Sequence, residues 1–337
     1  MFPDLLTRLL RRDDLTADEA AAAMNLVMRG EAHPAHVAGL LIGLAMKGER
    51  PAELVGLARA MRAHGVRLEA GPMAVDTCGT GGDRAGTFNI STAAALVVAA
   101  SGVPVVKHGN RSVSSHCGSA DVLEALGVAI EASPAAVQAA VRTAGIGFCF
   151  APTFHPAMRH VREVRKALGV PSAFNLLGPL TNPARVPFQI VGVARPELTE
   201  LMARALQQLG AERAWVVHGA DGLDELSTTG YSKVSECHGD VVRTFYVHPA
   251  DVGLPKSAAD ALRGGDAAHN AAIVRAVLAG ESGPARDVVL LNAGATLLVC
   301  GRVASLRDGI SMAAAAIDGG GAADTLDALT TAMRPAA

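Results

Sequence analysis

Residues 75–83 are Val75-Asp76-Thr77-Cys78-Gly79-Thr80-Gly81-Gly82-Asp83, and this stretch decides the fold. It predicts a short strand over 73–77 that runs into a turn with three glycines in four positions. Beyond the turn, residues 87–92 lead into an Ala- and Val-rich helix. Glycine lets the backbone approach a ligand, and the amides at a helix N-terminus favour phosphate. By itself the stretch fits an anion site and a tight strand-to-helix connection equally well.

Length and composition limit the alternatives. A chain of 337 residues is long enough for one large domain or two. Its hydrophobic content of 50% is sufficient for a large core. The net charge of −2 lacks the basic footprint of a nucleic-acid-binding domain, so we expect no nucleic acid partner. A small anion can still bind where the local field is positive.

The cysteines and the apolar segments indicate the cellular compartment of the protein. The five cysteines are far apart and form no C-x-x-C pair, which argues against a disulfide framework or a zinc site. The first residues lack the pattern of a signal peptide. The apolar runs fall short of the about 20 residues that a membrane span needs. We therefore expect a soluble cytoplasmic protein that does not associate with membranes.

Residues 1–70 predict a small helical domain with four short helices. Thr16-Ala17-Asp18-Glu19 is a capping box for the second helix, and Pro34 and Pro51 suit the first turns of the third and fourth. No strand pattern is present. The Leu and Met stripes are typical of packing surface, and part of that surface is a candidate subunit interface.

Residues 71–337 predict a larger α/β domain, and helices around 155–185 are expected to complete the small one. The predicted strands cover 73–77, 104–108, 146–150, 189–193, 214–218, 233–237 and 241–247. The predicted helices cover 91–101, 120–126, 134–144, 156–167, 196–209, 267–278, 287–300 and 310–329, the last broken by Gly319-Gly320-Gly321. This alternation favours a mostly parallel sheet that binds ligands at the carboxyl ends of its strands.

Two polar clusters after predicted strands suit phosphate. The first is the glycine turn with Asp83. The second is Lys107-His108-Gly109-Asn110-Arg111-Ser112-Val113-Ser114-Ser115, to which Ser119 adds a hydroxyl near the next helix. Lysine offers a point charge to phosphate, and serine hydroxyls and amides complete its oxygen shell. The alternative, a solvated loop, is less favoured because two such loops follow neighbouring strands.

Two further clusters lie at residues 154–166 and 175–183. His155 precedes a proline at a helix start, where a structural cap is the more common role. Arg165 lies on the same predicted helix, and an arginine can bind a carboxylate bidentately. Residues 175–183 contain Gly178 and Pro179, which indicate a fixed turn beside a flat ligand.

The last cluster, residues 221–227, is acidic. Asp224 and Glu225 are adjacent carboxylates in a turn after a strand, which suits Mg²⁺ held together with phosphate oxygens. A solvated acidic turn is the competing interpretation. The clusters together predict a ligand with several phosphates, bound with magnesium between a helical and an α/β unit. No activated nucleophile is evident, which suits a transfer that depends on positioning and charge stabilisation.

The ordered motifs resemble those of the anthranilate phosphoribosyltransferase family. They are DTCGTGGD at 76–83, TFNIST at 87–92, KHGNRSVSS at 107–115, GSADVLEALG at 118–127, FHPAM at 154–158, FNLLGPLTNP at 174–183 and DGLDELS at 221–227. The resemblance covers the chain through about residue 230 and is weaker beyond it. It implies a nucleoside phosphorylase-like fold, usually a homodimer through the helical domains. The implied reaction transfers a phosphoribosyl group from 5-phosphoribosyl 1-pyrophosphate to the amine of anthranilate.

The resemblance also implies residue roles. For the donor it implies Gly79, Gly82, Asp83, Thr87, Asn89, Ile90, Ser91, Thr92, Lys107, His108, Gly109, Asn110, Arg111, Ser112, Val113, Ser114, Ser115 and Ser119. For anthranilate it implies Gly79, His108, Asn110, His155, Arg165 and Gly178. For Mg²⁺ it implies Ser91, Asp224 and Glu225. We expect no general base on the protein, since an aromatic amine is neutral near pH 7, and assign positioning to Asp83, Lys107 and Arg165.

One departure from the family pattern and two alternatives accompany the resemblance. Pro171-Ser172 stands where many members carry Arg-Thr, which affects the details of the acceptor channel. A nucleoside phosphorylase of the same fold would use free phosphate and a nucleoside; Arg165 and residues 174–180 argue against it. A relative that binds nucleic acid without catalysis is disfavoured by the near-neutral charge and by the Asp224-Glu225 pair.

Overall fold

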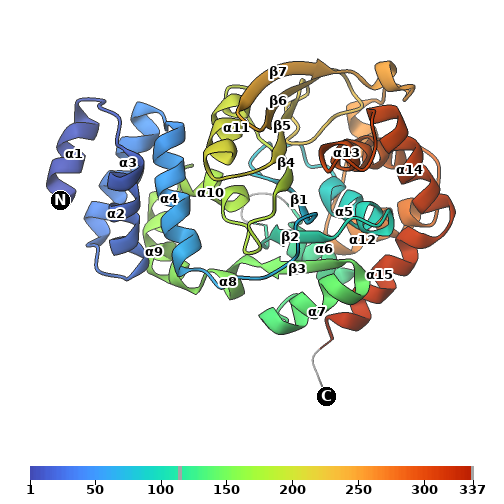
Figure 1. Ribbon diagram of the computed structural model, residues 1–337, viewed down its shortest axis with the longest axis horizontal. Helices are drawn as coiled ribbons and strands as arrows, with labels where there is room; N and C mark the ends of the chain where they lie inside the picture. The colour runs from blue at the N-terminus through green and yellow to red at the C-terminus, as the bar shows by residue number, and fades with distance from the viewer. Residues whose placement is uncertain (113–115, 335–337) are drawn as a thin grey trace.

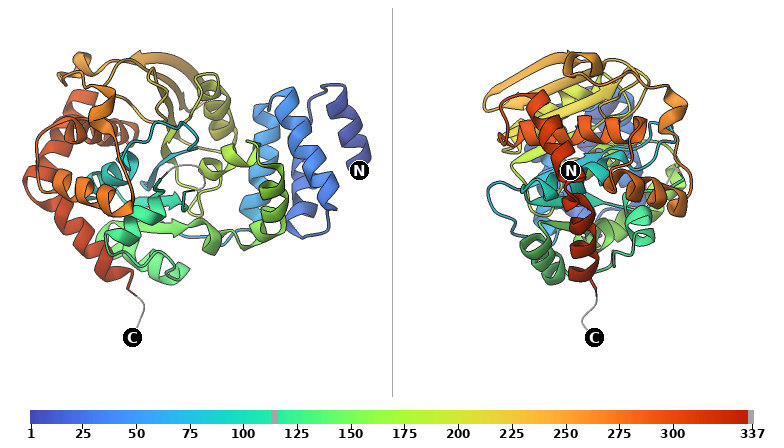
Figure 2. Two further views of the ribbon diagram at one scale, coloured as in Figure 1. Left: turned by 180° about the vertical axis from the view of Figure 1, so that it is seen from behind. Right: turned by 90° about the vertical axis from the view of Figure 1, so that its right-hand side faces the viewer.

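The computed structural model describes residues 1–112 and 116–334, and Figure 1 shows that they form two parts. Helices α1 to α4 stand together at one end of the molecule, and a twisted sheet with helices on both faces forms the rest. Figure 2 shows from behind that the C-terminal helices lie at the end opposite the N-terminal ones. The expected fold class, a small helical unit beside a larger α/β unit, is confirmed.

The helical part begins the chain with α1 (Phe2–Leu10), α2 (Ala17–Met28), α3 (Pro34–Lys47) and α4 (Pro51–His64). The expected capping box starts α2: the Thr16 hydroxyl accepts the N–H of Glu19 at 3.2 Å, and the Glu19 carboxylate accepts the N–H of Thr16 at 2.8 Å. Prolines open α3 and α4, where an N–H has no helical partner in any case. Buried apolar side chains from all four helices share one core.

The sheet has seven strands in the order β3-β2-β1-β4-β5-β6-β7. The strands are β1 (Val75–Gly79), β2 (Val105–Gly109), β3 (Ile146–Phe150), β4 (Phe188–Gly192), β5 (Arg213–Gly219), β6 (Ser232–His238) and β7 (Val241–Val247). Neighbours from β3 to β5 pair in parallel, while β6 and β7 add an antiparallel hairpin at one edge. Each predicted strand is present; β1 begins two residues late because Pro72 and Met73 form a turn.

The remaining helices surround the sheet. They are α5 (Ile90–Ala100), α6 (Ser119–Ala125), α7 (Pro134–Ala144), α8 (Ala151–Phe154), α9 (Arg159–Leu168), α10 (Phe174–Leu180), α11 (Leu198–Gln208), α12 (Ala267–Leu278), α13 (Pro284–Val299), α14 (Leu306–Asp318) and α15 (Gly321–Ala332). Short 3₁₀ turns lie at Pro156–Met158, Pro249–Val252 and Ala259–Leu262. None of the helices in the described part of the chain is long and apolar enough to cross a membrane.

The two faces of the sheet belong to two cores, because alternate strand residues point to opposite sides. Ile190 and Val217 point into one core with α5 and α13. Val191 and Val216 point into the other, which contains α11, α10 and the N-terminal helices. The helical part is therefore joined to one face of the sheet through α10 and α11.

Two connections differ from the sequence prediction. Residues 156–167, expected as one helix, divide into the 3₁₀ turn at Pro156–Met158 and α9. Residues 175–183, expected as a fixed turn, contain most of α10, which includes Pro179. Leu177 and Leu180 of this helix are fully buried, so tertiary packing outweighs the weak helix propensity of Gly and Pro.

Candidate active site

The carboxyl ends of neighbouring parallel strands meet at one edge of the sheet. There β1, β2, β4 and β5 end in Gly79, Gly109, Gly192 and Gly219. The glycine turn, the loop after Gly109 and the acidic loop all leave the sheet at this edge. The crevice outside the carboxyl ends of parallel strands is where such sheets bind ligands.

The glycine turn after β1 wraps around the side chain of Asp224. The N–H of Gly81 donates to Asp224 Oδ2 at 2.8 Å. A Cβ atom at Gly79 would lie 2.3 Å from the same oxygen, so any side chain there would displace the Asp224 carboxylate. The N–H of Asp224 faces Asp83 Oδ2 at 3.5 Å. The turn and the acidic loop are thus one unit of the site.

The acidic pair consists of carboxyl groups whose charged forms are disfavoured by their surroundings. Burial, followed by the carboxylates of Asp83 and Glu225, raises the pKa of Asp224 well above its usual range. Burial raises the pKa of Glu225 to about 7, although Lys107 and Ser91 act in the opposite direction. Glu225 Oε1 also accepts the N–H of Ser91 at 3.1 Å. One backbone N–H in the first turn of α5 is therefore already bonded to a carboxylate.

The oxygen atoms of this corner fit Mg²⁺ in the way that the ion usually binds to proteins. Mg²⁺ is commonly held by one or two carboxylates, with water and phosphate oxygens as its other ligands. Across residues 1–112 and 116–334, no three His, Cys, Asp or Glu side chains form a complete metal site. Asp224, Glu225 and the hydroxyl of Ser91 supply oxygen ligands of the right kind. A ligand that brings phosphate oxygens would complete the coordination.

Lys107 places a buried cation beside the acidic pair. Only 2% of its surface is exposed. Its ammonium group donates to Thr77 O at 2.6 Å and lies 3.4 Å from Ser91 Oγ. Burial lowers the pKa of Lys107, while Asp76 and Glu225 favour its charged form. The lysine therefore points to the junction of β1 and α5, where a phosphate would meet its charge.

The loop after β2 is held by α6. Asp121 accepts the N–H groups of Ser112 and Gly118 at 3.0 and 2.9 Å. Arg111 pairs with Asp121 at 3.0 Å and with Glu124 at 2.8 Å. The guanidinium of Arg111 is therefore directed to α6 and is already neutralised by carboxylates.

The other residues expected at the donor differ in whether their polar groups already have hydrogen-bond partners. Ser119 starts α6, with its Oγ 3.5 Å from Asn110 O. Ile90 lies in the core and donates its N–H to Phe88 O at 2.8 Å. The hydroxyl of Thr92 is buried and has no hydrogen-bond partner among the described residues. Val113, Ser114 and Ser115 lie outside the described residues.

His108, near the end of β2, and His155, after α8, are buried and pack against each other. Their ring centroids are 5.1 Å apart, and His108 Nδ1 lies 3.1 Å from Gly178 O. Burial lowers the pKa of His108 to about 3 and that of His155 to about 4, so both rings are neutral at pH 7. The helix-cap role expected for His155 is wrong, because its side chain makes no cap hydrogen bond to the 3₁₀ turn that follows.

Arg165 projects from α9 over the ring of Phe174 at the start of α10. Its guanidinium carbon lies 5.1 Å from the ring centroid of Phe174. Burial lowers the pKa of Arg165, and no carboxylate in the described part of the molecule pairs with it. A half-buried guanidinium without a carboxylate is suited to a carboxylate ligand. Pro171 and Ser172 precede α10, where Asn175 Oδ1 accepts the N–H of Ser172 at 3.1 Å.

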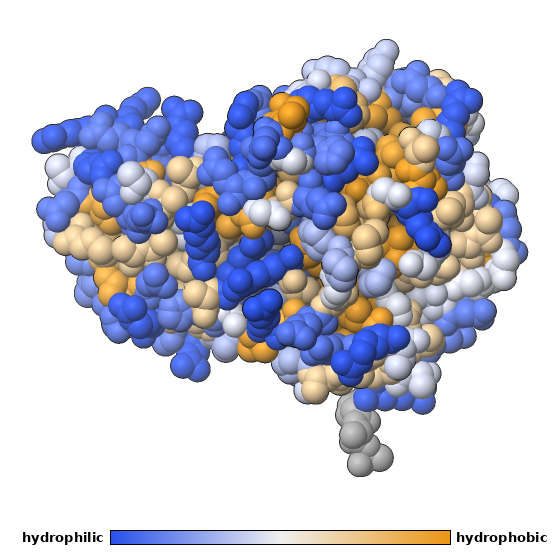
Figure 3. Space-filling view, viewed as in Figure 1, coloured by the Kyte–Doolittle hydropathy of each residue, from blue (hydrophilic) through white to orange (hydrophobic). Residues whose placement is uncertain are grey.

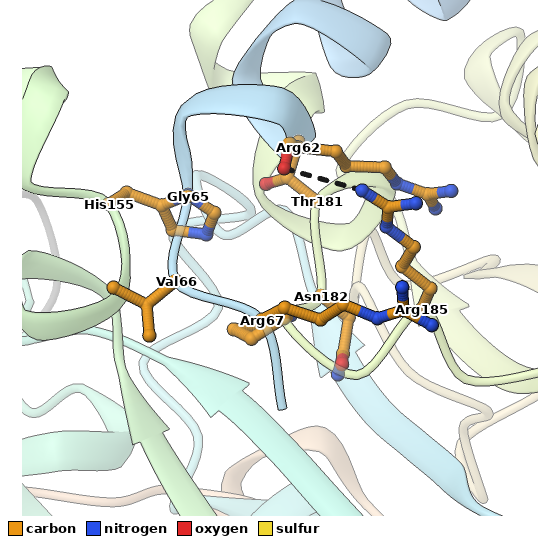
Figure 4. A pocket seen from close by; sticks show the side chains of 9 residues that line it. Arg62, Gly65, Val66, Arg67, His155, Thr181, Asn182 and Arg185 are labelled. Atoms are coloured by element: carbon orange, nitrogen blue, oxygen red, sulfur yellow. Dashed lines mark hydrogen bonds between the residues drawn. The ribbon is translucent and has the colours of Figure 1, made fainter. Parts of the chain in front are cut away.

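Behind His155, Figure 4 shows a small pocket with the side chains of several arginines. Arg62 donates to Leu180 O at 2.8 Å and lies 3.4 Å from Leu209 O. Arg185 donates to Arg62 O at 3.4 Å, the bond drawn in Figure 4. Basic side chains of this kind satisfy the last carbonyls of helices. We interpret the pocket as the joint that ties α4 to α10 and α11.

Comparisons with known proteins decide the family. A family model described as "Glycosyl transferase family, a/b domain" matches residues 71–323, and one described as "Glycosyl transferase family, helical bundle domain" matches residues 3–65. The chain is 51% identical over 333 residues to the anthranilate phosphoribosyltransferase of Azorhizobium caulinodans, covering 99% of this chain and 97% of that one. This chain belongs to the anthranilate phosphoribosyltransferase family.

Solved structures of the anthranilate phosphoribosyltransferase family share the fold throughout. The crystal structure of the Thermus thermophilus enzyme matches with a TM-score of 0.93 and 45% identity, over 98% of this chain and 99% of that chain. The Saccharomyces cerevisiae enzyme in complex with PRPP and Mg matches with a TM-score of 0.89 and 26% identity, over 98% of this chain and 97% of that chain.

The structure adds residues to the anthranilate phosphoribosyltransferase site that sequence analysis missed. Asp76 is fully buried, and its carboxylate accepts the N–H of His108 at 3.3 Å and the side-chain N–H of Asn182 at 2.8 Å. Asn182 also donates to Val106 O at 2.8 Å. These contacts fix the backbone of β2, the strand that carries Lys107, beside β1. A lone carboxylate in an apolar strand was the available signal, because a buried Asp is rare unless it is paired.

The neutral histidines predict a loss of stability in acid. For each histidine the folded-state pKa, about 3 or about 4, lies below the unfolded value of 6.5. Their contribution is present above pH 6.5 and is lost as the pH falls, because the unfolded chain then binds more protons. Each ring is expected to cost about 1.4 kcal/mol per pH unit below 6.5. Urea unfolding from pH 7 to 5 measures the slope, and His155→Gln should make it shallower; an unchanged slope would contradict the neutral state of His155.

Proposed function

We propose that the loops at the carboxyl ends of β1, β2, β4 and β5 form the active site for the reaction of this family. The chain transfers the phosphoribosyl group of 5-phosphoribosyl 1-pyrophosphate to the amino group of anthranilate in tryptophan biosynthesis. The products are N-(5-phosphoribosyl)anthranilate and pyrophosphate. The observation that carries this proposal is that the glycine turn, the acidic pair and Lys107 meet at one corner: Gly81 N–H donates to Asp224, Ser91 N–H donates to Glu225, and Lys107 Nζ lies beside Ser91 Oγ.

For the donor we propose the glycine turn, Asn89, Ser91 and the loop from Lys107 to Ser119. Asp224, Glu225 and Ser91 would hold Mg²⁺. When bound, Mg²⁺ supplies positive charge to the pyrophosphate oxygens and stabilises the leaving group. Lys107 adds a second cation to the same region. The support is the donor set itself: the buried carboxylate of Glu225 lies beside the first turn of α5, and the carboxylate of Asp224 is bonded to the glycine turn.

For the acceptor we propose Arg165, with His108, His155, Asn110 and Gly178 around the ring of anthranilate. Arg165 would orient the carboxylate, and neutral histidines suit an uncharged aromatic ring. The amine nitrogen uses its lone pair to form the bond to the anomeric carbon, while the bond to pyrophosphate breaks with its electron pair on oxygen. The amine is already neutral near pH 7 and releases its proton after attack, so no protein base is required.

The domain division is part of the proposal. Residues 1–70 would form the small domain together with the helices between 155 and 185, and residues 71–337 the large one. Val161 of α9 and Phe174 of α10 support this division, because both are buried in the core that the N-terminal helices share. Closure of the two domains would exclude water that otherwise hydrolyses the donor. We place the enzyme in the cytoplasm, since its cysteines are all free.

Arg165→Ala is expected to raise the KM for anthranilate by roughly 10- to 100-fold, the usual worth of a charge-assisted hydrogen bond. The KM for the donor should stay near the wild-type value. Steady-state kinetics with each substrate varied in turn measure both constants. Arg162→Ala, which removes an exposed arginine from the same helix, is the matched control. An unchanged KM for anthranilate would remove Arg165 from the acceptor site.

We also propose a homodimer through the helical domain. Leu10 is 85% exposed and Met46 is 75% exposed, which is unusual for large apolar side chains on neighbouring helices. Figure 3 shows apolar residues gathered over the helical part on the visible face. Leu10→Glu with Met46→Glu is expected to convert a dimer to a monomer in light scattering. Val241→Glu, an equally drastic change on β7, should leave the dimer intact, and a wild-type monomer would refute the interface.

Product analysis tests the reaction against its nearest alternative. Mass spectrometry should detect N-(5-phosphoribosyl)anthranilate and pyrophosphate after incubation with both substrates and Mg²⁺. A nucleoside phosphorylase would instead cleave thymidine or uridine in the presence of phosphate. Phosphate-dependent cleavage of these nucleosides without the anthranilate product would overturn the proposed function.

A further inference from the structure

A segment in the C-terminal third of the chain lies directly against residues 86–88, which lie between the glycine turn and α5. We call residues 86–88 the donor loop. The N–H of Phe88 donates to Leu262 O at 3.2 Å, and the N–H of Gly264 donates to Gly86 O at 2.8 Å. Thr87 and Arg263 form an isolated antiparallel bridge between these bonds. We call residues 262–270 the strap. It holds the backbone of residues 86–88 as an added strand would.

The strap needs glycine where it crosses the donor loop. A Cβ atom at Gly264 would lie 2.6 Å from the backbone nitrogen of Phe88 and 2.7 Å from Asn270 Oδ1. The contact with Phe88 is with backbone, and the Asn270 oxygen belongs to a buried side chain that is held by two hydrogen bonds. Because the two backbones approach so closely at Gly264, the start of α12, three residues further on, is held next to the donor loop.

Asn270 connects the strap to the donor residue Asn89. Only 1% of Asn270 is exposed. Its Oδ1 accepts the N–H of Gly265 at 2.7 Å, and its Nδ2 donates to Asn89 Oδ1 at 3.0 Å. The second bond spans 181 positions of sequence. An asparagine with both ends bonded in a buried site has one orientation.

The amide of Asn89 is held from two sides. Its Oδ1 faces Asn270 Nδ2 and also the thiol of Cys117, which lies 3.3 Å away. Its Nδ2 donates one N–H to Cys117 O at 3.2 Å. The described residues offer no acceptor to the second N–H. The orientation set by Asn270 thus leaves Asn89 with a free donor group, and an N–H is what the oxygen atoms of a phosphorylated sugar bind.

We propose that Asn270 is a positioning residue for the donor site. It fixes the amide of Asn89 so that an N–H, and not the carbonyl oxygen, is presented to oxygen atoms of the phosphoribosyl donor. Through Asn89 and Cys117 it also connects α12 to the end of the loop between β2 and α6. This inference rests on the proposed role of Asn89 in binding the donor.

Asn270→Asp separates the two roles of this side chain, which are positioning the Asn89 amide and bonding to the strap at Gly265. The aspartate keeps the shape and the acceptor for Gly265 but loses the donor to Asn89 Oδ1. The new carboxylate oxygen repels Asn89 Oδ1 and attracts Asn89 Nδ2, so the amide is expected to turn, giving up its bond to Cys117 O and presenting its oxygen to the donor. The KM for 5-phosphoribosyl 1-pyrophosphate should rise about tenfold, the worth of one hydrogen bond to a charged group, with the KM for anthranilate unchanged. Asn25→Asp on α2 is the matched control and should change neither constant.

A double-mutant cycle with Asn89→Ala distinguishes positioning from general loss of structure. If Asn270 acts through Asn89, adding Asn270→Asp to Asn89→Ala should leave the donor KM of the single Asn89 variant unchanged. A further tenfold rise in the double variant would overturn the inference, as would a normal donor KM in Asn270→Asp. Should Asn270→Asp not fold, Asn270→Ala assayed below its melting temperature takes its place with the same expected cycle. A normal donor KM for Asn89→Ala alone would refute the proposed donor site and the inference with it.

Discussion

Asp224→Asn combined with Glu225→Gln is expected to lower kcat/KM for the donor by roughly 10³-fold, which corresponds to the several kcal/mol that a bound cation contributes. Both side chains keep their shape, and the turn around Asp224 keeps an oxygen acceptor for the N–H of Gly81. The loss should therefore come from metal and donor binding rather than from unfolding. Calorimetric titration of Mg²⁺ with the donor and steady-state kinetics measure it.

The same variant should be more stable than the wild type when Mg²⁺ is absent. The pKa of Glu225 is raised to about 7, above its unfolded value, so its carboxyl group costs stability as the pH rises through that range. Removing both charges is expected to raise the free energy of unfolding at pH 8 by on the order of 2 kcal/mol. Glu212→Gln with Asp240→Asn, two exposed carboxylates away from the site, is the control. Full activity in the Asp224 and Glu225 variant would refute the magnesium assignment.

Gly192→Ala is expected to be the most damaging single substitution in the site. A Cβ atom there would lie 1.5 Å from Asp224 O, a backbone atom that cannot move without displacing the acidic loop. Donor turnover should fall below detection, and the protein should lose about 3 kcal/mol or more of stability, the range of severe overpacking. Thermal unfolding and donor-saturation kinetics measure the two effects.

Three further glycine substitutions sharpen this prediction. Gly79→Ala meets only the carboxylate of Asp224, at 2.3 Å, so it should weaken donor binding with little change in melting temperature. Gly82→Ala meets no atom within 4 Å, but its φ of +85° adds about 1 kcal/mol of strain. Gly230→Ala, which has neither problem, should behave as the wild type. Normal donor binding in Gly192→Ala would contradict the close packing of β4 against the acidic loop.

Local patterns in the sequence were sufficient to predict most elements of the fold. The capping box at Thr16 and Glu19, the prolines at helix starts and the β-branched strands each depend on neighbours in sequence. Helix α10 was missed because its stability comes from burial of Leu177 and Leu180 against distant elements. Propensity alone disfavours a helix that contains Gly178 and Pro179.

The candidate site shows the same division. Residue types and motif order were enough to select the loops, and the structure brings these loops to one edge of the sheet. The sequence could not show that Glu225 accepts a backbone N–H in the first turn of α5, or that the side chain of Lys107 is almost fully buried. Asn270 was also missed, because its bond to Asn89 spans 181 positions of sequence and no local pattern marks it.

The most direct test of the whole account is the fluorescence of anthranilate, followed during incubation with the purified enzyme. Four reactions are compared: complete, without 5-phosphoribosyl 1-pyrophosphate, without Mg²⁺ and without enzyme. We expect fluorescence to decay only in the complete reaction, with chelation stopping the decay and added Mg²⁺ restoring it. Stable fluorescence in the complete reaction, or decay that persists without Mg²⁺, would contradict the account of a magnesium-dependent transfer at this edge of the sheet.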